Sequence, residues 1–298
     1  ETNFNDRPAD DYGKYMRTII EYSIEQGVVP ILATKGDNVE GDNSINAEIA
    51  EIAVEYDIPL WNLWAALQPL PIPIQKYLRF SGAVGKPKPQ RFRAHWTGRI
   101  RGAASDPWME FVAEQVNTYG RAQDRLFFMD AVMKGLPVDV YHRFVGSEAT
   151  ARVKLLSLVS MVDAKGAEMN RAETVTLFND IALLAPAWLA DPAIRWEPID
   201  DLSARATFSR GTESISAVLY VDTSGMLVNF ISDDRLMAGK EGKSFARVRW
   251  STPLRDPKTF GSLRLGSRGE GRWHPQDAAD FSYIELELTN LEYDGKAP

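Results

Sequence analysis

The feature that most constrains the fold of this chain is a change in its hydrophobic pattern near residue 70. Before that point, apolar residues recur at spacings of three and four, or form one short continuous run. These patterns are typical of helices and of a parallel strand covered on both faces. After it, the strictly alternating stretch RFRAHWTGRIR (91–101) opens a series of half-buried strands. The change predicts two domains, at residues 1–69 and 70–298.

The charge of the chain changes at the same place. Of the net charge of −7, residues 1–70 contribute −9 and residues 71–298 contribute +2. Residues 71–105 contain eight Lys and Arg residues and no acidic residue. Such an asymmetry indicates two units with different surface fields.

Composition excludes several classes of protein. A hydrophobic content of 44% is that of a globular domain, and no run of about 18 apolar residues predicts a transmembrane helix. The absence of cysteine excludes disulfides, thiolate nucleophiles and cysteine-ligated metals. With no signal-like segment at Glu1 and no cysteine, we expect a cytoplasmic protein.

The first unit has the pattern of a β-α-β fragment. Helices are predicted at residues 10–26 and around 45–53, and strands at 28–34 and 58–60. The connections are short, so the strands are expected to pair in parallel through a right-handed crossover.

The first unit also resembles a known family. The text RPADDYGKYMRTIIEYSIEQGVVPILATKGDNVEGDNSINAEIAEIAVEYDIPLWNLW, within residues 1–66, resembles the later half of an SGNH (GDSL-type) hydrolase. In that family a Gly-Asp-Ser nucleophile and a late Asp-x-x-His block complete a triad, and both blocks are missing here. Asn3 matches an oxyanion donor of the family. The resemblance implies a truncated segment without esterase activity, or an SGNH-type esterase if the missing blocks are supplied.

The second unit reads as antiparallel strands with helical segments. A helix is predicted over 170–189, with Asn170 as N-cap and Glu173 in a capping-box position. Residues 222–225 predict a hairpin turn, and the glycine-rich GSLRLGSRGEG (261–271) reads as a loop. The predicted fold class is α+β, a short α/β fragment followed by a curved antiparallel sheet with helices packed against it.

Residues 70–294 resemble an uncharacterised bacterial family of unknown function. The similarity lies in PIQKYLRFSGAVGKP, NRAETVTLFNDIALLAPAWL and IRWEPIDDLSARATF, and in VRWSTPL, GRWHP and FSYIELELTNLEY. The resemblance implies a long curved sheet similar to LolA-like folds, and it implies no catalytic residues. Fold alone does not determine function.

A sheet of this kind can enclose an apolar or lipid-like molecule against its helix. We therefore expect non-catalytic binding of such a ligand, and the alternative is a structural or interaction domain with a filled core. The expected lining residues come from the first strand and the helical segment: Phe92, Trp96, Ile100, Leu177, Ile181, Leu184 and Trp188.

One face of the strand 91–101 carries arginines that could bind an anion, namely Arg91, Arg93, Arg99 and Arg101. The favoured alternative is that acidic residues of a neighbouring strand, Glu285 and Glu287, pair with them. No specific nucleic-acid binding is expected, because the domain carries only +2 and lacks recognition motifs.

No metal or cofactor is expected. His95, His142 and His274 are too widely spaced for a recognisable zinc motif. No glycine-rich phosphate loop precedes a helix. The sequence leaves the oligomeric state open.

Overall fold

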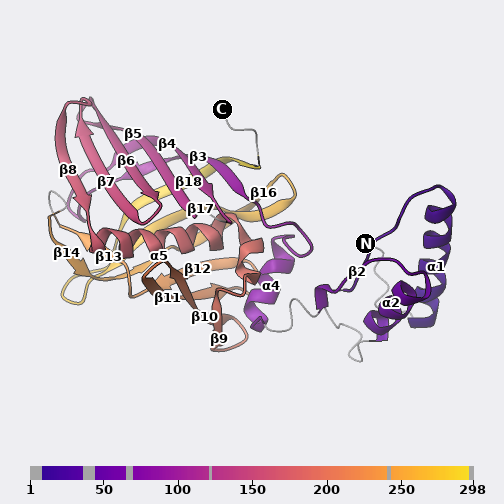
Figure 1. Cartoon of the computed structure of the whole chain (residues 1–298). Coiled ribbons are helices and arrows are strands. Elements are labelled where there is room, and N and C mark those ends of the chain that lie inside the picture. Colours follow the sequence, from indigo (N-terminus) through magenta and orange to yellow (C-terminus); the bar gives the residue numbers. More distant parts are fainter. Residues whose placement is uncertain (1–8, 36–43, 65–69, 121–122, 240–242, 295–298) are drawn as a thin grey trace. The chain divides into compact units, whose positions relative to one another are not determined.

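A computed structural model describes residues 9–35, 44–64, 70–120, 123–239 and 243–294 (Figure 1). Contacts divide the chain into two compact units, Glu1–Leu70 and Pro71–Pro298. Each unit is described by itself.

The first unit is a small α/β fragment. Its elements in chain order are α1 (Ala9–Glu25), β1 (Leu32–Ala33), α2 (Ser44–Glu55) and β2 (Leu60–Trp61). The two strands pair in parallel, as the β-α-β pattern predicted. Its core consists of Ile20, Leu32, Ile45, Ile49, Ile52 and Ala53. Asn3 lies outside the described residues.

The predicted strand 28–34 is wrong in extent and in burial. Only Leu32–Ala33 is a strand, and the exposed fractions of Val28, Val29 and Ile31 are 57%, 74% and 69%. The physical reason is that β1 pairs with only one strand, β2, among the described residues of the unit. A continuous apolar run is buried only where a complete sheet surrounds it.

The second unit begins with α4 (Ile72–Phe80) and continues into a sheet of 14 strands among the described residues. The strands are β3 (Arg91–Ile100), β4 (Met109–Thr118), β5 (Asp124–Met133), β6 (Leu136–Val145), β7 (Glu148–Leu155), β8 (Val159–Lys165), β9 (Arg195–Pro198), β10 (Ser203–Arg210), β11 (Glu213–Val221), β12 (Leu227–Ser232), β15 (Arg249–Ser251), β16 (Leu254–Phe260), β17 (Leu263–His274) and β18 (Phe281–Tyr293). A separate pair is β13 (Leu236–Ala238) with β14 (Phe245–Arg247).

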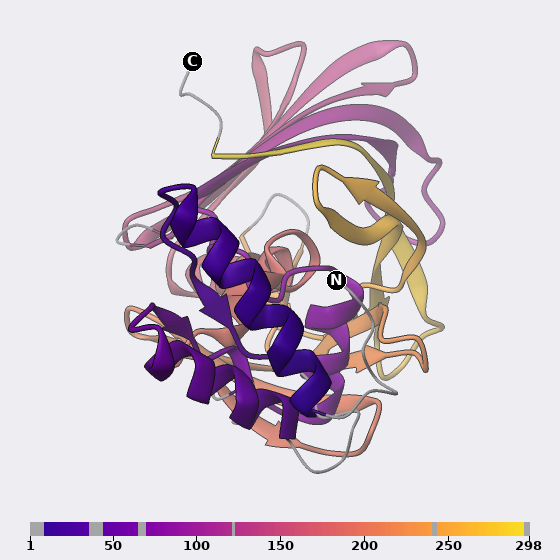
Figure 2. The same ribbon diagram turned by 90° about the vertical axis from the view of Figure 1, so that its right-hand side faces the viewer.

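The sheet curves around one helix. Its strand order is β8-β7-β6-β5-β4-β3-β18-β17-β15-β12-β11-β10-β9, with β16 attached to β17. Between the edge strands β8 and β9, the chain forms α5 (Ala167–Leu184) and the short helix η1 (Pro186–Ala190). Helix α5 contacts β7 and β8 on one arm of the sheet and β11 and β12 on the other, inside the bend seen in Figure 2. The α+β class with a curved antiparallel sheet is confirmed.

Local sequence explains the inner face of the sheet. Alternation in β3 buries Phe92, Ala94 and Trp96, as the 91–101 pattern predicted. The predicted turn is also confirmed, because the Gly225 backbone N–H donates to the carbonyl oxygen of Asp222 between β11 and β12.

Two sequence interpretations are wrong. Asn170 is not the N-cap, because α5 begins three residues earlier, after Gly166 with φ of 102°. The Asn170 side chain instead accepts a hydrogen bond of 2.7 Å from the backbone N–H of Ala149. The stretch 261–271 is not a loop, since most of it belongs to β17. Gly261 lies in the turn before β17, whereas Gly271 lies on a strand position that a neighbour approaches closely: a Cβ there would meet Ile284 Cγ2 at 2.7 Å.

We predict that residues 71–298, produced as a shortened chain, unfold cooperatively at the same urea midpoint as the main transition of the full chain. The second unit contains its own extensive core, whereas the first unit buries too little apolar surface to be more than marginally stable. Far-UV circular dichroism and tryptophan emission would be measured in parallel on both chains. An insoluble or non-cooperative shortened chain would contradict the prediction.

Candidate functional site

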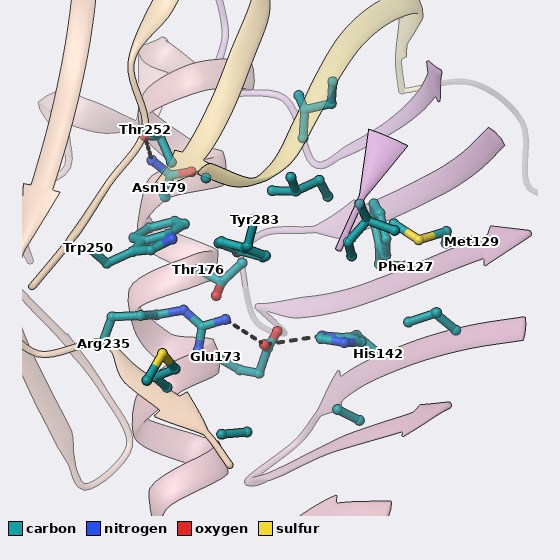
Figure 3. Close-up of a pocket in the computed structure, with 18 of the residues that line it drawn as sticks. Phe127, Met129, His142, Glu173, Thr176, Asn179, Arg235, Trp250, Thr252 and Tyr283 are labelled. Atoms are coloured by element: carbon teal, nitrogen blue, oxygen red, sulfur yellow. Dashed lines mark hydrogen bonds and ion pairs between the residues drawn. The ribbon is translucent and has the colours of Figure 1, made fainter. Parts of the chain in front are cut away.

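A cavity of about 330 Å³ lies between the inner face of the curved sheet and helix α5. Its walls are mostly apolar, and they come from both arms of the sheet, from α5 and from the β13–β14 pair (Figure 3). The apolar lining includes Trp96, Ile100, Phe127, Met129, Val140, Val153, Val162, Met169, Leu183, Leu184, Leu236, Met237, Phe245, Trp250, Leu254, Trp273, Ile284 and Leu286. Volumes of 300–1,000 Å³ are typical of sites for small organic ligands.

Three of the residues expected to bind a ligand line this cavity: Trp96, Ile100 and Leu184. The others are placed elsewhere in the core. Phe92 is fully buried against Tyr119, and Leu177 and Ile181 are buried on α5 without lining the cavity. Because α5 is enclosed by both arms of the sheet, its apolar residues divide between the cavity and the packed core.

Trp188 is the fourth expected residue that does not line the cavity. Its ring centroid lies 5.6 Å from that of Tyr119, and its Nε1 donates a 2.7 Å hydrogen bond to the carbonyl oxygen of Pro89. Its role as a ligand contact has no support in this geometry.

Small inner residues leave room for the cavity. Gly269 and Gly271 of β17 and Ala151 and Ala164 of β7 and β8 all line it. Inner positions of a curved sheet usually carry large side chains that fill the interior. Here Ala151 and Ala164 carry only a methyl group, so space remains between the sheet and α5, whereas Leu254 and Ile284 pack against Gly269 and Gly271.

A cluster of buried charges forms the polar part of the site. Glu173 and Asp180 are two helical turns apart on α5 and therefore share one face. Arg125 of β5 lies between them, with Nη1 3.2 Å from Glu173 Oε2 and Nε 2.7 Å from Asp180 Oδ2. Gln115 and Asn117 of β4 also donate to Asp180 Oδ2, at 2.7 and 3.0 Å. The cluster therefore ties α5 to the sheet.

Glu173 is the centre of this cluster. Figure 3 shows its carboxylate between His142 and Arg235; His142 Nδ1 is 3.3 Å away and Arg235 Nη2 is 3.7 Å away. A carboxylate only accepts hydrogen bonds, so His142 Nδ1 carries the proton of this contact. Burial raises the pKa of Glu173, but Arg125, His142 and Arg235 outweigh burial and lower that pKa to about 2. Glu173 is therefore ionised at neutral pH although it is completely buried.

Sequence reasoning missed every member of this charge cluster. Glu173 was interpreted as a capping residue, and Arg125, His142, Asp180 and Arg235 were not associated with one another. One signal was present: two acidic residues seven apart fall on the same face of a helix that otherwise has many apolar residues.

The arginines of β3 and the adjoining Arg101 are largely engaged by neighbouring protein groups. Arg99 pairs with Glu285 at 2.8 Å, which confirms the expected partner on the neighbouring strand. Arg93 lies 2.9 Å from Glu114, and Arg101 donates to the carbonyl oxygens of Ser282 and Ala104. Glu287 is opposite Thr97 and pairs instead with Lys258 and Arg268. Anion binding by Arg91, Arg93, Arg99 and Arg101 stays a prediction.

A second polar cluster has the contacts of a catalytic triad. Ser251 Oγ is 2.7 Å from His274 Nε2, and His274 Nδ1 is 2.6 Å from Asp280 Oδ2. Strand alternation, however, places Ser251 and His274 on the face opposite Trp250 and Trp273, which line the cavity. The exposed fraction of Ser251 is 1%, so a substrate carbonyl has no access to its hydroxyl. The cluster is a hydrogen-bond network of the outer face.

Residues 63–286 match DUF6544, a family of unknown function. The chain belongs to this family. Membership of an uncharacterised family was expected from the sequence and is confirmed. No curated protein matches the DUF6544 chain. The comparisons give no support to the SGNH resemblance of residues 1–66 or to a cytoplasmic location.

Two solved structures are similar to the DUF6544 chain at low sequence identity. A DUF1329 family protein from Desulfovibrio piger is 13% identical, with a TM-score of 0.44, covering 77% of this chain and 95% of its own. A LolA superfamily protein from Nitrosomonas europaea is 8% identical, with a TM-score of 0.35, covering 76% and 93%.

Two further findings concern the described part of the chain. It contains no helix long and apolar enough to cross a membrane. It also contains no group of three or more histidine and acidic side chains placed to bind a metal ion.

We predict that Glu173→Gln destabilises the protein by about 3–5 kcal/mol at pH 7, because it removes one partner of a buried charge cluster. The lowered pKa of Glu173 means that its ionic contribution is fully present above about pH 4.5 and is lost as the pH falls towards 2. The difference between wild type and variant should therefore shrink over that range. Urea unfolding at several pH values measures it.

The matched control is Asp163→Asn, which removes the carboxylate of the exposed Arg152–Asp163 pair at 3.5 Å. Exposed pairs contribute about 0–1 kcal/mol, so this change should have little effect. The prediction would be contradicted if Glu173→Gln lowered the free energy of unfolding no more than Asp163→Asn does. It would also be contradicted if the effect of Glu173→Gln were the same at pH 7 and pH 2.5.

We also predict that Ser251 is not a nucleophile. Because its hydroxyl is buried on a sheet face, the protein should not hydrolyse p-nitrophenyl esters above background, and a fluorophosphonate should not modify it. Intact-mass spectrometry checks the second point. Modification that disappears in Ser251→Ala would show that the triad is accessible and reactive.

Proposed function

We propose that the second unit binds an apolar or lipid-like molecule, without chemical conversion, in the cavity beside α5. The observation that carries this proposal is the cavity of about 330 Å³ with predominantly apolar walls and a few buried polar groups at one region of its surface. Apolar walls with a small number of placed polar groups are the usual design of sites for small organic molecules.

The charges of the site favour binding over catalysis. Glu173 and Asp180 are engaged by Arg125, His142 and neighbouring amides, and Glu173 has a lowered pKa. A general base or acid works best with a pKa near the operating pH. Glu173 is therefore a poor proton acceptor at neutral pH, and its contacts favour a role in positioning α5.

Two other functions have less support. An SGNH-type esterase would need the two missing motif blocks in addition to the first unit, and the arrangement around Ser251 gives no substrate access. A purely structural domain would be expected to have an interior filled by side chains. The cavity of about 330 Å³ is therefore not expected of such a domain. In this proposal the first unit is a hydrolase-like segment without activity, fused in front of the binding domain.

We predict that Val140→Trp abolishes binding of Nile red. Val140 is a partly exposed residue of β6 in the cavity wall, so a larger side chain at this position would occupy the space of a ligand. Overpacking costs about 1–3 kcal/mol, and less where space exists, so the fold should survive. Dye fluorescence titration measures the binding, and thermal unfolding checks the fold.

The matched control is Val132→Trp on the neighbouring strand, because Val132 is exposed and does not line the cavity. This variant should bind the dye as the wild type does. Equal loss of binding in both variants, or no saturable binding by the wild type, would contradict the proposed function. It would favour the alternative, a structural domain with a filled core.

A further inference from the structure

We infer that the ligand of this cavity is an acyl ester, a molecule with an apolar body and an uncharged carbonyl that accepts hydrogen bonds. The inference rests on the proposed function and names the ligand chemistry of the same site. It follows from two observations, the unpaired donors in the cavity wall and the balance of its charges.

The wall contains buried donors without partners. Trp96 Nε1 and Arg235 Nε are both buried and have no hydrogen-bond partner within the described ranges. Trp96 and Arg235 are 7% and 9% exposed, and both line the cavity. Buried polar groups in folded proteins are nearly always paired, so each exception requires an explanation. A ligand that supplies acceptors is such an explanation.

The carboxylates of the site are already engaged. Glu173 Oε1 contacts His142 Nδ1, and Glu173 Oε2 pairs with Arg125 Nη1. Asp180 Oδ2 accepts from Arg125 Nε and from two side-chain amides. The buried side-chain atoms without a partner among the described residues are all N–H donors, so this wall offers donors rather than acceptors. An ester fits this arrangement, because its oxygens accept hydrogen bonds and it has no N–H or O–H to satisfy.

The Arg235 donor is also held in a defined position. Its guanidinium lies 5.5 Å from the centre of the Trp250 ring and 3.7 Å from Glu173. A donor that is positioned before the ligand arrives loses little side-chain freedom on binding. Arg235 Nε can therefore serve as a recognition group rather than as a mobile surface charge.

The charges of the wall favour an uncharged ligand. Apart from Tyr283, the ionisable residues that line it are Arg101, Arg125, Arg235, Glu173, Asp180, Glu270 and His142. Three are cationic and three are anionic, which leaves no net charge when His142 is neutral. A carboxylate ligand would give the site a net charge of −1, and burying a net charge is costly. Arg101 already donates to the carbonyl oxygens of Ser282 and Ala104. The acceptor should therefore be a carbonyl rather than an anion.

The test compares three probes with the same chain length: methyl dodecanoate, dodecanoate and dodecane. Each displaces Nile red from the full-length protein. We expect methyl dodecanoate to bind about tenfold more tightly than dodecane, as one or two hydrogen bonds predict, and more tightly than dodecanoate. Diacylglycerol and a peptide with an O-acylated serine then distinguish a lipid from an acylated protein as the source of the ester.

Trp96→Phe tests the donor directly, because it removes one N–H and retains an aromatic ring. The preference for the ester over dodecane should fall about two- to tenfold. Trp188→Phe is the matched control, since Trp188 is outside the cavity and its N–H is bonded to Pro89. This variant should keep the wild-type preference.

The outcomes separate this inference from the proposed function. Equal binding of the ester and dodecane, tighter binding of dodecanoate, or an ester preference unchanged by Trp96→Phe would overturn the inference and leave apolar binding in place. Failure of all three probes to displace the dye, or no dye binding at all, would overturn the proposed function itself.

Discussion

The structure of the second unit depends on the buried ion pairs between Arg125 and the two carboxylates of α5. Glu173 and Asp180 lie on one face of that helix, and Arg125 reaches both from β5. Because an unpaired buried charge is strongly unfavourable, a rotation or a shift of α5 along its axis would break these contacts. The cluster therefore specifies one position of the helix inside the curved sheet, where apolar packing alone would allow several.

The position of α5 in turn determines the cavity. Helix α5 leaves a cavity of about 330 Å³ against the inner face of the curved sheet, where Ala151 and Ala164 present little side-chain volume. If α5 could approach these residues, the space would close. The charge cluster keeps the helix at the distance that Arg125 spans, so the small residues border open space. The same cluster thus stabilises the fold and maintains a potential binding site.

Sequence patterns predicted those elements whose buried face follows from the spacing of their own hydrophobic residues. The alternation of residues 91–101 predicted β3, its buried face and the pairing of Arg99 with Glu285. The patterns gave wrong predictions where burial depends on packing against neighbouring elements. The apolar run 28–34 is largely exposed because β1 pairs with a single strand among the described residues. The glycines of β17 predict a loop, but Gly271 is instead a strand position packed against Ile284. The two prolines at the start of α4 did not suggest a helix, but Pro71 at the N-cap and Pro73 in the first turn are compatible with one, because N–H groups there have no partner within the helix.

By itself, the sequence determined the α+β class and the apolar face of β3, because these follow from local periodicity and composition. It indicated Trp96, Ile100 and Leu184 as lining residues for the same reason. Only the tertiary structure brought Arg125, His142 and Arg235 to Glu173, since they come from separate strands and loops distant in the chain. No period relates such residues: their proximity depends on how far the sheet bends around α5, which is a property of the whole fold.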